Sequence, residues 1–575
     1  MVCHGEVIMR KRTHVKIHLL FCISMACITA CSAATNHVLN ASFEINSNPG
    51  LADCWGKGGW GLRSLEEINH PEEYRSRLSI DTSDCVHGMK CMRISNPVGK
   101  PPLSLFSTWI SYPQFLAGRK GWCVSAYIKV SPPATVVVSL LDSQYRLIAK
   151  NSFAVENKWQ RYSFPIKTNI SPVVIKISPP EGTNCLIDCV QFSQGEEPGE
   201  WSPAADETMI ATPKVPPREY VSSVTVKTKM PEAVKEVNSK NGWVHVNSNA
   251  FLPYAIGMQY EIDLPFLQKI KECGFNTVKF YALNPNQTKK NLDLSYQAGL
   301  RAIPWLRCKA SEISEMVECF KNHPALVTWL ALDEPPEPFV QKVTNLIKSV
   351  KDADQERPSW VNYRTNEINR FMDKLPSLPG DIISADWYPV TDMNYPAKPC
   401  DPAELIKKMT VRLKESDKIV WFILQLCGNA FMLQREPTPE EFEGMVYSSI
   451  IAGANGLFFF QNIPWNARLM EVAGKIGAEL ENLTPILANG DCIDINASES
   501  VIKIKSLLYQ GELYIFAVNT SEKPLTCRFN FGDGISTPKK IAVLFEERSL
   551  IMTEDHVLTD QFNGFQRHIY HLQKH

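Results

Sequence analysis

The chain has 575 residues, of which 44% are hydrophobic and 21% are charged, and its formal net charge is −1. A chain of this length exceeds what a single hydrophobic core organises, so we expect two to four domains. The balanced charge argues against a nucleic-acid partner, because phosphate binding requires an excess of Lys and Arg on one surface.

The N-terminal segment has the composition of a targeting signal. Basic residues at positions 10–16 precede an apolar run, 17–30, that is too short to span a bilayer. The run leads into ITAC at 28–31, which resembles a bacterial lipobox, and that resemblance implies lipidation of Cys31; SAA at 32–34 suits ordinary signal peptidase instead. We therefore predict that residues 1–34 direct export and that the protein is a cell-surface or periplasmic lipoprotein, or secreted. No later stretch is apolar for long enough to predict a membrane span, so any membrane attachment would be through this lipid anchor.

Seventeen cysteines are spread over the whole chain, so they do not form the framework of a small disulfide-rich domain. Cys85 with Cys91, and Cys185 with Cys189, are close enough to pair in an oxidising compartment, although spacing alone leaves both pairings open. No Cys or His cluster has the spacing of a zinc site. We expect no metal and no cofactor.

Residues 35–205 predict a β-sandwich. Short alternating strands with frequent turn residues run through this region, as in two-layer antiparallel folds. The strands with the clearest pattern are 121–130, 134–142, 159–166, 173–178 and 185–193. The opening NASFE, the stretches HGMKCMRI and KWQRYSF, and the closing LIDCVQF resemble a carbohydrate-binding module of the galactose-binding-like jelly-roll type. Such sandwiches also occur as spacers without a ligand, so ligand binding by this module stays open.

The centre of the chain predicts a different fold. Residues 206–240 are rich in Pro, Val, Lys, Ser and Thr and are predicted to be a linker. From 241 to 495, strand-like runs alternate with amphipathic segments of the length of crossover helices. Eight such units predict a (β/α)8 barrel with strands within 251–260, 276–283, 301–307, 326–335, 358–365, 381–390, 418–428 and 453–462. Strand alternation returns afterwards, so 496–575 predict a C-terminal antiparallel β-sandwich.

Active-site residues of a (β/α)8 barrel lie at the carboxyl ends of its strands. Strand four ends with Asp333 and Glu334, and strand six ends with Asp386. The further polar and aromatic side chains at the strand ends are candidates for substrate contacts: Tyr260, Tyr281, Arg307, Tyr363, Tyr388, Gln425 and Gln461, with Trp465 in the loop after strand eight. This mixture suits a neutral, polyhydroxylated ligand, because carboxylates and amides bind hydroxyl groups and aromatic rings stack on a sugar.

The segment HPALVTWLALDEP at 323–335 resembles the fourth strand of the clan A glycoside hydrolases, in which a Trp-containing strand ends in Asn-Glu-Pro. The resemblance implies that Glu334 is the general acid and that Asp333, in the place of the Asn, orients the sugar. Glycoside cleavage needs such an acid together with a second carboxylate. The alternative interpretation of the acidic pair is an ion pair between Asp333 or Glu334 and Arg307 or Arg364.

Strand seven departs from the clan A pattern, because Gln425 stands where those enzymes carry a Glu nucleophile. An amide cannot form a covalent glycosyl-enzyme, so three interpretations stay open. Asp386 is the second carboxylate; or the substrate supplies its own nucleophile, as in the β-hexosaminidases, where an Asp-Glu pair works beside a Tyr such as Tyr388; or the barrel binds glycans without catalysis, as a surface lipoprotein.

From these alternatives we predict an exported glycosidase that hydrolyses O-glycosidic bonds of a poly- or oligosaccharide. Its catalytic residues are predicted to be Glu334, Asp333 and Asp386.

Overall fold

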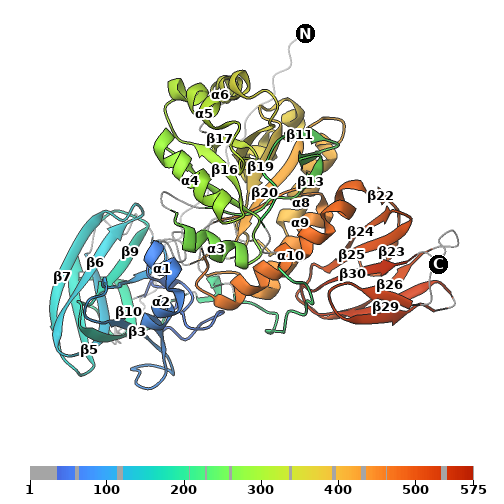
Figure 1. The fold of residues 1–575 in the computed structure, drawn as a ribbon. Helices are drawn as coiled ribbons and strands as arrows, with labels where there is room; N and C mark the ends of the chain where they lie inside the picture. Colours follow the sequence, from blue (N-terminus) through green and yellow to red (C-terminus); the bar gives the residue numbers. More distant parts are fainter. Residues whose placement is uncertain are drawn as a thin grey trace, which may run out of the picture.

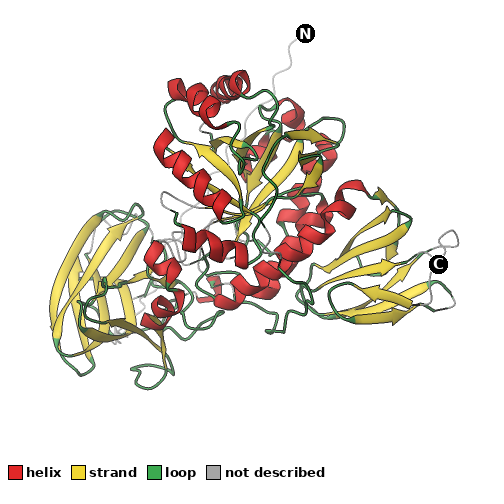
Figure 2. Cartoon of the chain, viewed as in Figure 1, coloured by secondary structure: helices red, strands yellow, loops and turns green. Residues whose placement is uncertain are grey.

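The computed structural model describes residues 35–573 except 59–63, 113–120, 206, 211, 227–229, 258–261, 336–339, 391–396, 429–434, 461–462, 532–539 and 554. A parallel barrel wrapped in helices lies between two antiparallel β-sandwiches (Figures 1 and 2). The predicted fold class is thereby confirmed in all three parts. The leader and Cys31 lie outside the described residues.

The N-terminal sandwich consists of two five-stranded antiparallel sheets, ordered β1-β4-β9-β6-β7 and β2-β3-β10-β5-β8. Its strands are β1 (Trp55–Gly56), β2 (Leu78–Asp81), β3 (Cys91–Asn96), β4 (Leu105–Ser107), β5 (Trp122–Ser131), β6 (Ala134–Asp142), β7 (Leu147–Val155), β8 (Gln160–Ile166), β9 (Val173–Ser178) and β10 (Thr183–Gln194). Two short helices, α1 (Leu65–Asn69) and α2 (Pro71–Arg77), precede β2. The core contains Trp122 stacked on Phe192, with ring centroids 4.9 Å apart. Alternation of buried and exposed residues therefore predicted these sheets correctly.

The cysteines of the described residues are all free thiols, including the four for which pairing was considered. The Cys85 thiol donates to the Asp81 carbonyl at 3.6 Å, and the Cys91 thiol donates to the Asp84 carbonyl at 3.3 Å. Burial raises the pKa of Cys185 and of Cys189. These thiols belong to the sandwich interior and give no sign of a reactive site.

A three-stranded antiparallel sheet closes the amino-terminal end of the barrel. It contains β11 (Val237–Lys240), β12 (Trp243–Val246) and β13 (Asn249–Phe251), so the last residues of the predicted linker form a strand. Its valines pack against apolar side chains inside the barrel, among them Ala255, Ile303 and Ile419. The opposite, carboxyl end of the barrel is consequently the end that a ligand can approach.

Eight parallel strands form the closed barrel: β14 (Tyr254–Gly257), β15 (Thr277–Ala282), β16 (Arg301–Leu306), β17 (Trp329–Asp333), β18 (Ser359–Arg364), β19 (Ile382–Asp386), β20 (Ile419–Gln425) and β21 (Leu457–Phe460). The surrounding helices are α3 (Leu264–Glu272), α4 (Pro285–Gln297), α5 (Ile313–Phe320), α6 (Val340–Ala353), α7 (Thr365–Arg370), α8 (Pro402–Leu413), α9 (Pro439–Ala452) and α10 (Ala467–Asn489). Along the strands, apart from a bulge in β17, alternate side chains face the barrel interior and the helices. This alternation decides which strand-end residues reach the mouth.

Local signals set the helix ends as the sequence predicts. Thr438 caps α9 and forms a reciprocal capping box with Glu441, while Pro439 occupies the first helical turn. Gly453 ends the helix with φ of 109°, a left-handed conformation that glycine adopts without a steric penalty. The chain then enters β21 in the orientation that completes the barrel.

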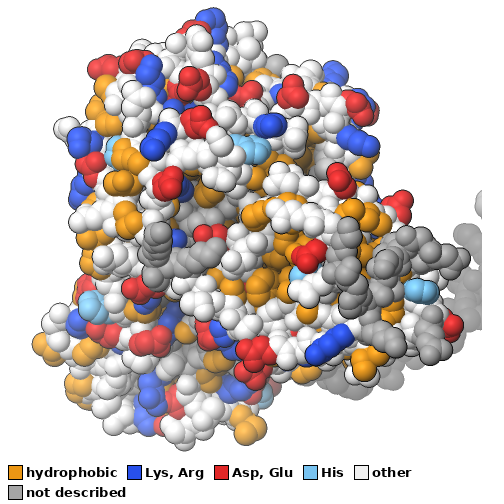
Figure 3. Space-filling view, turned by 45° about the vertical axis from the view of Figure 1, so that its right-hand side comes forward, with side chains coloured by type: hydrophobic (Ala, Val, Ile, Leu, Met, Phe, Trp, Pro, Cys, Tyr) orange, Lys and Arg blue, Asp and Glu red, His pale blue; other side chains and the backbone are white. Residues whose placement is uncertain are grey.

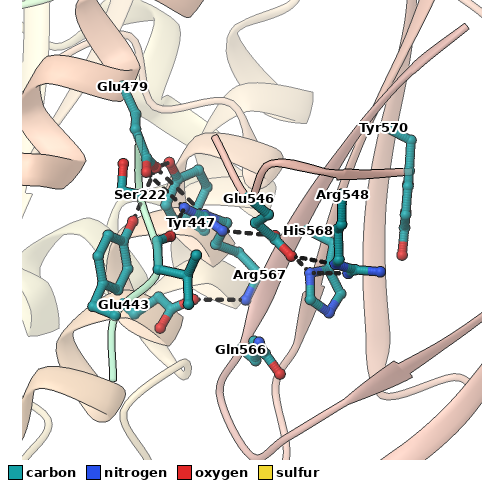
Figure 4. Close-up of polar contacts among 12 residues, drawn as sticks. Ser222, Glu443, Tyr447, Glu479, Glu546, Arg548, Gln566, Arg567, His568 and Tyr570 are labelled. Atoms are coloured by element: carbon teal, nitrogen blue, oxygen red, sulfur yellow. Dashed lines mark hydrogen bonds and ion pairs between the residues drawn. The ribbon is translucent and has the colours of Figure 1, made fainter. Parts of the chain in front are cut away.

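The C-terminal sandwich has sheets ordered β22-β24-β25-β30-β27-β28 and β23-β26-β29. Its strands are β22 (Asp491–Cys492), β23 (Asn496–Ala497), β24 (Ile502–Tyr509), β25 (Glu512–Asn519), β26 (Leu525–Asn530), β27 (Lys540–Val543), β28 (Arg548–Ile551), β29 (Val557–Phe562) and β30 (Arg567–Leu572). A buried ionic network joins this sandwich to α9 and α10 (Figure 4). At its centre Arg567 contacts Glu479 of α10 at 2.6 Å and Glu546 at 2.8 Å. Because these side chains are almost wholly buried, loss of one partner would leave an uncompensated charge.

No helix of the described residues is long and apolar enough to cross a membrane. On the face shown in Figure 3, acidic and basic side chains are interspersed rather than segregated.

Candidate active site

A β-bulge directs the end of β17 into the barrel. The pairing of β17 with β18 shifts register between Leu330 and Leu332, after which Asp333 lies opposite Asn362. Leu330 packs inside the barrel, so strict alternation would turn Asp333, three residues later, toward the helices. The extra residue at the bulge reverses that parity, and Asp333 faces the barrel interior together with Asn362.

Asp333 is held by neighbours on β18 and β15. Its Oδ1 accepts a hydrogen bond of 2.7 Å from Asn362 Nδ2, and its Oδ2 lies 4.0 Å from Lys279 Nζ. Burial raises the pKa of Asp333, while Lys279 and Asn362 oppose that rise. Asn362 is itself fixed, because its Oδ1 accepts a hydrogen bond of 2.7 Å from Ser384 Oγ. Ser384 Oγ in turn accepts one from Trp360 Nε1, so a chain of buried hydrogen bonds orients the Asp333 carboxyl.

Glu334 sits at the turn directly after β17, with its side chain 40% exposed. Its backbone is left-handed, with φ of 45°, a conformation that costs energy for a residue with a side chain and is concentrated at functional sites. Its Oε2 accepts a hydrogen bond of 3.0 Å from Arg364 Nε, so one of the ion pairs considered as an alternative is present. Since both side chains are half-exposed, the pair stabilises the fold by no more than about 1 kcal/mol and leaves Glu334 accessible.

Asp386 joins this pair from the end of β19. Its carboxyl hydrogen-bonds Glu334 and accepts a hydrogen bond of 3.1 Å from the Tyr388 hydroxyl. Burial raises the pKa of Asp386 well above its ordinary value, and the nearby carboxyls of Glu334 and Asp333 raise it further. Asp386 therefore keeps a proton under conditions in which an isolated Asp is ionised.

Aromatic side chains form one wall of the mouth. Tyr281 packs against Trp305 with ring centroids 4.8 Å apart, and the Arg307 guanidinium lies 4.6 Å from the Trp305 ring and 5.3 Å from the Tyr281 ring. On the other side, Tyr388 stacks on Phe460 at 4.7 Å. The structure thus brings Tyr281, Arg307 and Tyr388 to the same end of the barrel as the carboxyls.

Three residues predicted to contact substrate are placed elsewhere. Tyr363 faces the helices because it alternates with Asn362, and its hydroxyl donates to the Pro379 carbonyl. Gln425 faces the barrel but is fully buried, and its amide binds the backbone of Val390, Cys427 and Arg435. Trp465 is buried in the main hydrophobic core. These corrections assign all three side chains to the scaffold rather than to a ligand surface.

Tyr260 and Gln461 lie outside the described residues, so the structure does not place them. Conversely, the sequence analysis missed Lys279 and Ser384. Lys279 stands two residues before Tyr281 on β15 and shares its orientation, which was the available signal. Ser384 has the same relation to Asp386 on β19. Within the part of the chain that the structure describes, no group of acidic, His or Cys side chains has the geometry of a metal site.

Comparison with known proteins identifies the barrel. Residues 249–398 match the family model described as the TIM barrel domain of the family 2 glycosyl hydrolases. The central domain is similar, over these residues, to the TIM barrel of that family. The match spans strands β14 to β19 and includes Asp333, Glu334 and Asp386, so the likeness to a glycosidase family concerns the part of the barrel that carries the three carboxyls. It ends before β20, the strand that carries Gln425.

Solved structures that resemble this chain are distant from it in sequence. A family 5 glycoside hydrolase from Bacteroides vulgatus is 12% identical over 60% of this chain and 95% of its own, with a TM-score of 0.43. A family 2 β-galacturonidase from Eisenbergiella tayi is 12% identical over 70% of this chain and 96% of its own, with a TM-score of 0.34. No curated protein matches the sequence. The chemistry of this chain is therefore inferred from the family 2 barrel match and from the geometry of the strand ends.

Proposed function

We propose that this chain hydrolyses a glycosidic bond at the carboxyl end of its barrel, with Glu334 as the proton donor, Asp333 as the residue that orients the sugar, and Asp386 as the second carboxyl group. The observation that carries this proposal is the hydrogen bond between Glu334 and Asp386 beside Asp333, at the mouth of a family 2 barrel. Holding three carboxyls in one place costs free energy, because their mutual repulsion and burial oppose ionisation. Such an arrangement indicates a functional site.

A single proton accounts for the Glu334 and Asp386 pair. Arg364 donates a hydrogen bond to Glu334, whereas burial raises the pKa of Asp386. Two hydrogen-bonded carboxyls share a proton in the bond between them, and the raised pKa of Asp386 helps to keep that proton in the pair. That proton is available at the exposed partner, Glu334, when the leaving oxygen of a substrate replaces Asp386 as its neighbour. Cleavage then breaks the bond between the anomeric carbon and the leaving oxygen, which takes the proton from Glu334, while a carboxylate balances the oxocarbenium-like charge. Water adds to the anomeric carbon and returns a proton to the carboxyl pair.

The spacing of the two carboxyls bears on the mechanism. Retaining glycosidases keep their carboxyl groups about 5–5.5 Å apart and inverting enzymes about 6.5–9.5 Å, whereas a hydrogen-bonded pair is closer than either. A sugar must therefore displace Glu334 from Asp386, which its partly exposed side chain permits. On that path Asp386 serves as the second carboxylate.

Substrate assistance is a second candidate mechanism. It is favoured by the amide at the end of strand seven and by the groups around the carboxyls. Gln425 is buried and cannot act as a nucleophile, and Asp333 and Glu334 are adjacent with the Tyr388 hydroxyl close to Asp386. In such a mechanism a 2-acetamido group of the substrate attacks its own anomeric carbon and Asp333 orients that group. This path requires no carboxylate nucleophile from the protein.

Export and lipidation of Cys31 belong to the same proposal, on the basis of the basic and apolar N-terminal segment and the ITAC sequence. In a bacterial host that processes lipoproteins, the wild-type chain should fractionate with membranes and incorporate labelled palmitate. The Cys31→Ser variant should do neither. Palmitate incorporation into Cys31→Ser would disprove lipidation at this residue.

The activity is tested with a panel of aryl glycosides that includes N-acetylated sugars. Wild-type protein should release the aryl group from at least one of them, and Glu334→Gln should lose activity by about 10²–10⁴ while its sugar affinity persists. Glu318→Gln is the matched control, because Glu318 makes only an exposed ion pair with Lys321 on a barrel helix. Cleavage of N-acetylated sugars alone would indicate substrate assistance. Sugar binding without cleavage of any glycoside would leave only a glycan-binding role.

A further inference from the structure

The Arg307 guanidinium lies at the mouth, where it forms no ion pair with the described residues and acts on Asp333 only through its charge. Its cationic group lies over both Trp305 and Tyr281, so the two rings fix its position through cation–π contacts. It makes no hydrogen bond or ion pair with a carboxylate of the described residues. A guanidinium that stacks through its face keeps the N–H donors at its edge available for a ligand.

Lys279 adds a second positive charge on the same wall. Its Nζ lies 5.2 Å from the Trp305 ring and 5.9 Å from the Trp360 ring, and its side chain is only 12% exposed. Its nearest acidic partner among the described residues is Asp333, at 4.0 Å. Lys279 is therefore a nearly buried ammonium whose field acts on whatever occupies the space beside Asp333.

Among the described residues at the mouth, cations outnumber anions when Glu334 holds the proton that it donates. Lys279, Arg307 and Arg364 are positive, and three carboxyls face them. Glu334 and Asp386 hold one proton between them, and Glu334 donates it in the reaction. At most two of the three carboxyls are then ionised against three cations. A neutral sugar would leave this excess uncompensated, whereas an anionic one would balance it.

We propose that the substrate sugar carries a carboxylate, as in a uronic acid, and that Arg307 binds this carboxylate through its guanidinium edge while Lys279 supports it from the same wall. This inference rests on the proposed glycosidase activity and replaces the neutral ligand expected from the sequence. A planar carboxylate matches the fork of an arginine, and such paired, charge-assisted hydrogen bonds are among the strongest in proteins. Arg307 is thus a specificity-determining residue of the site.

The inference is tested with matched pairs of 4-nitrophenyl glycosides: glucuronide with glucoside, and galacturonide with galactoside. Wild-type protein should prefer the uronide of one pair. Arg307→Gln should lower kcat/KM for that uronide by about 10- to 100-fold, the effect of losing hydrogen bonds to a charged group, and should lower it much less for the neutral partner, so that the uronide preference is lost. Arg307→Lys keeps the charge but not the fork, so it should restore only part of the preference.

Arg370→Gln is the matched control, because Arg370 also lies over an aromatic ring, that of Phe371, but on α7 outside the mouth. It should behave as wild type. The inference is overturned if the wild-type kcat/KM is the same for a neutral glycoside and for its uronide. It is also overturned if Arg307→Gln lowers kcat/KM for both by the same factor, or if a 6-sulfated hexoside is preferred to the uronide.

Binding separates this inference from the proposed activity. Calorimetry with free glucuronate, galacturonate, glucose and galactose requires no cleavage. Wild-type protein should bind one of the uronates more tightly than its neutral counterpart, and Arg307→Gln should lose that difference. If no glycoside is cleaved but the uronate preference and its loss in Arg307→Gln are found, hydrolysis is disproved and the carboxylate site stands. Equal affinity for uronate and neutral sugar in the wild-type protein disproves the carboxylate site.

Discussion

Glu436 provides a pH-dependent test of the contact between its own loop and the start of α10. Its side chain is 3% exposed and accepts hydrogen bonds from the backbone amides of Trp465 and Asn466, at the start of α10. Burial raises the pKa of Glu436 from 4.5 to about 7, although those hydrogen bonds and the nearby Arg75 oppose the rise. The folded chain therefore keeps a proton on Glu436 up to near-neutral pH, while the unfolded chain loses it near pH 4.5.

The sign and size of the effect follow from this difference. Between pH 4.5 and 7 the folded state binds the extra proton, so the contribution of Glu436 to stability falls as pH rises. A rise from 4.5 to about 7 corresponds to about 3 kcal/mol, at about 1.4 kcal/mol for each pKa unit. Glu436→Gln removes this term. Relative to wild type, the variant should gain about 3 kcal/mol between pH 4.5 and pH 8, after a pH-independent loss of about 1 kcal/mol from weaker hydrogen bonds.

The assay is denaturant unfolding of the full chain at pH 4.5 and pH 8, for wild type, Glu436→Gln and Glu318→Gln. Other titrating groups cancel when each variant is compared with wild type at the same pH. The exposed control Glu318→Gln should show little change at either pH. A stability difference between Glu436→Gln and wild type that is the same at both pH values would refute the reasoning.

Three further substitutions test the site and the domain junction. Asp386→Asn should lower kcat and yet raise the melting temperature above neutral pH, because the variant avoids the proton uptake that burial imposes on Asp386; the increase should vanish in acid, where Asp386 is protonated in both states. Asn362→Ala should cost about 1–3 kcal/mol in unfolding experiments, by leaving buried partners without hydrogen bonds, and should raise KM through a misoriented Asp333. Arg567→Met should cost about 3–5 kcal/mol, because it leaves Glu479 buried without its cation; unchanged thermal unfolding would contradict the buried network.

The fold was predictable because its signals are periodic and local. Eight apolar runs separated by amphipathic segments require a barrel, and the Thr438 capping box with Gly453 sets a helix end from sequence alone. The acidic pair after β17 was found because a buried strand that ends in two carboxylates is unusual. Asp386 was found by its equivalent place at the end of β19.

Side-chain orientation limited the prediction of the site. The bulge between Leu330 and Leu332 reverses the parity of β17, and no pattern in the sequence marks it. On β18 the consecutive residues Asn362 and Tyr363 face opposite sides, Asn362 toward the barrel interior and Tyr363 toward the helices. An aromatic side chain at a strand end is compatible with either side, so the sequence does not decide between them.

Tertiary contacts account for the other differences. Gln425 hydrogen-bonds the backbone of loops, and Trp465 packs in the core. These contacts arise between segments that are distant in sequence. Lys279 lies in the middle of a strand rather than at its end, and it reaches the mouth through its long side chain.

The role of Glu334 as general acid is tested by how strongly the Glu334→Gln defect depends on the leaving group. If Glu334 protonates the leaving oxygen, kcat/KM should fall by about 10²–10⁴ for an alkyl or phenyl glycoside of the preferred sugar, which needs that proton. The loss should be small for the 2,4-dinitrophenyl glycoside, whose leaving group departs as an anion. An equal loss with both leaving groups, or no loss with either, would contradict the assignment of Glu334 as the general acid.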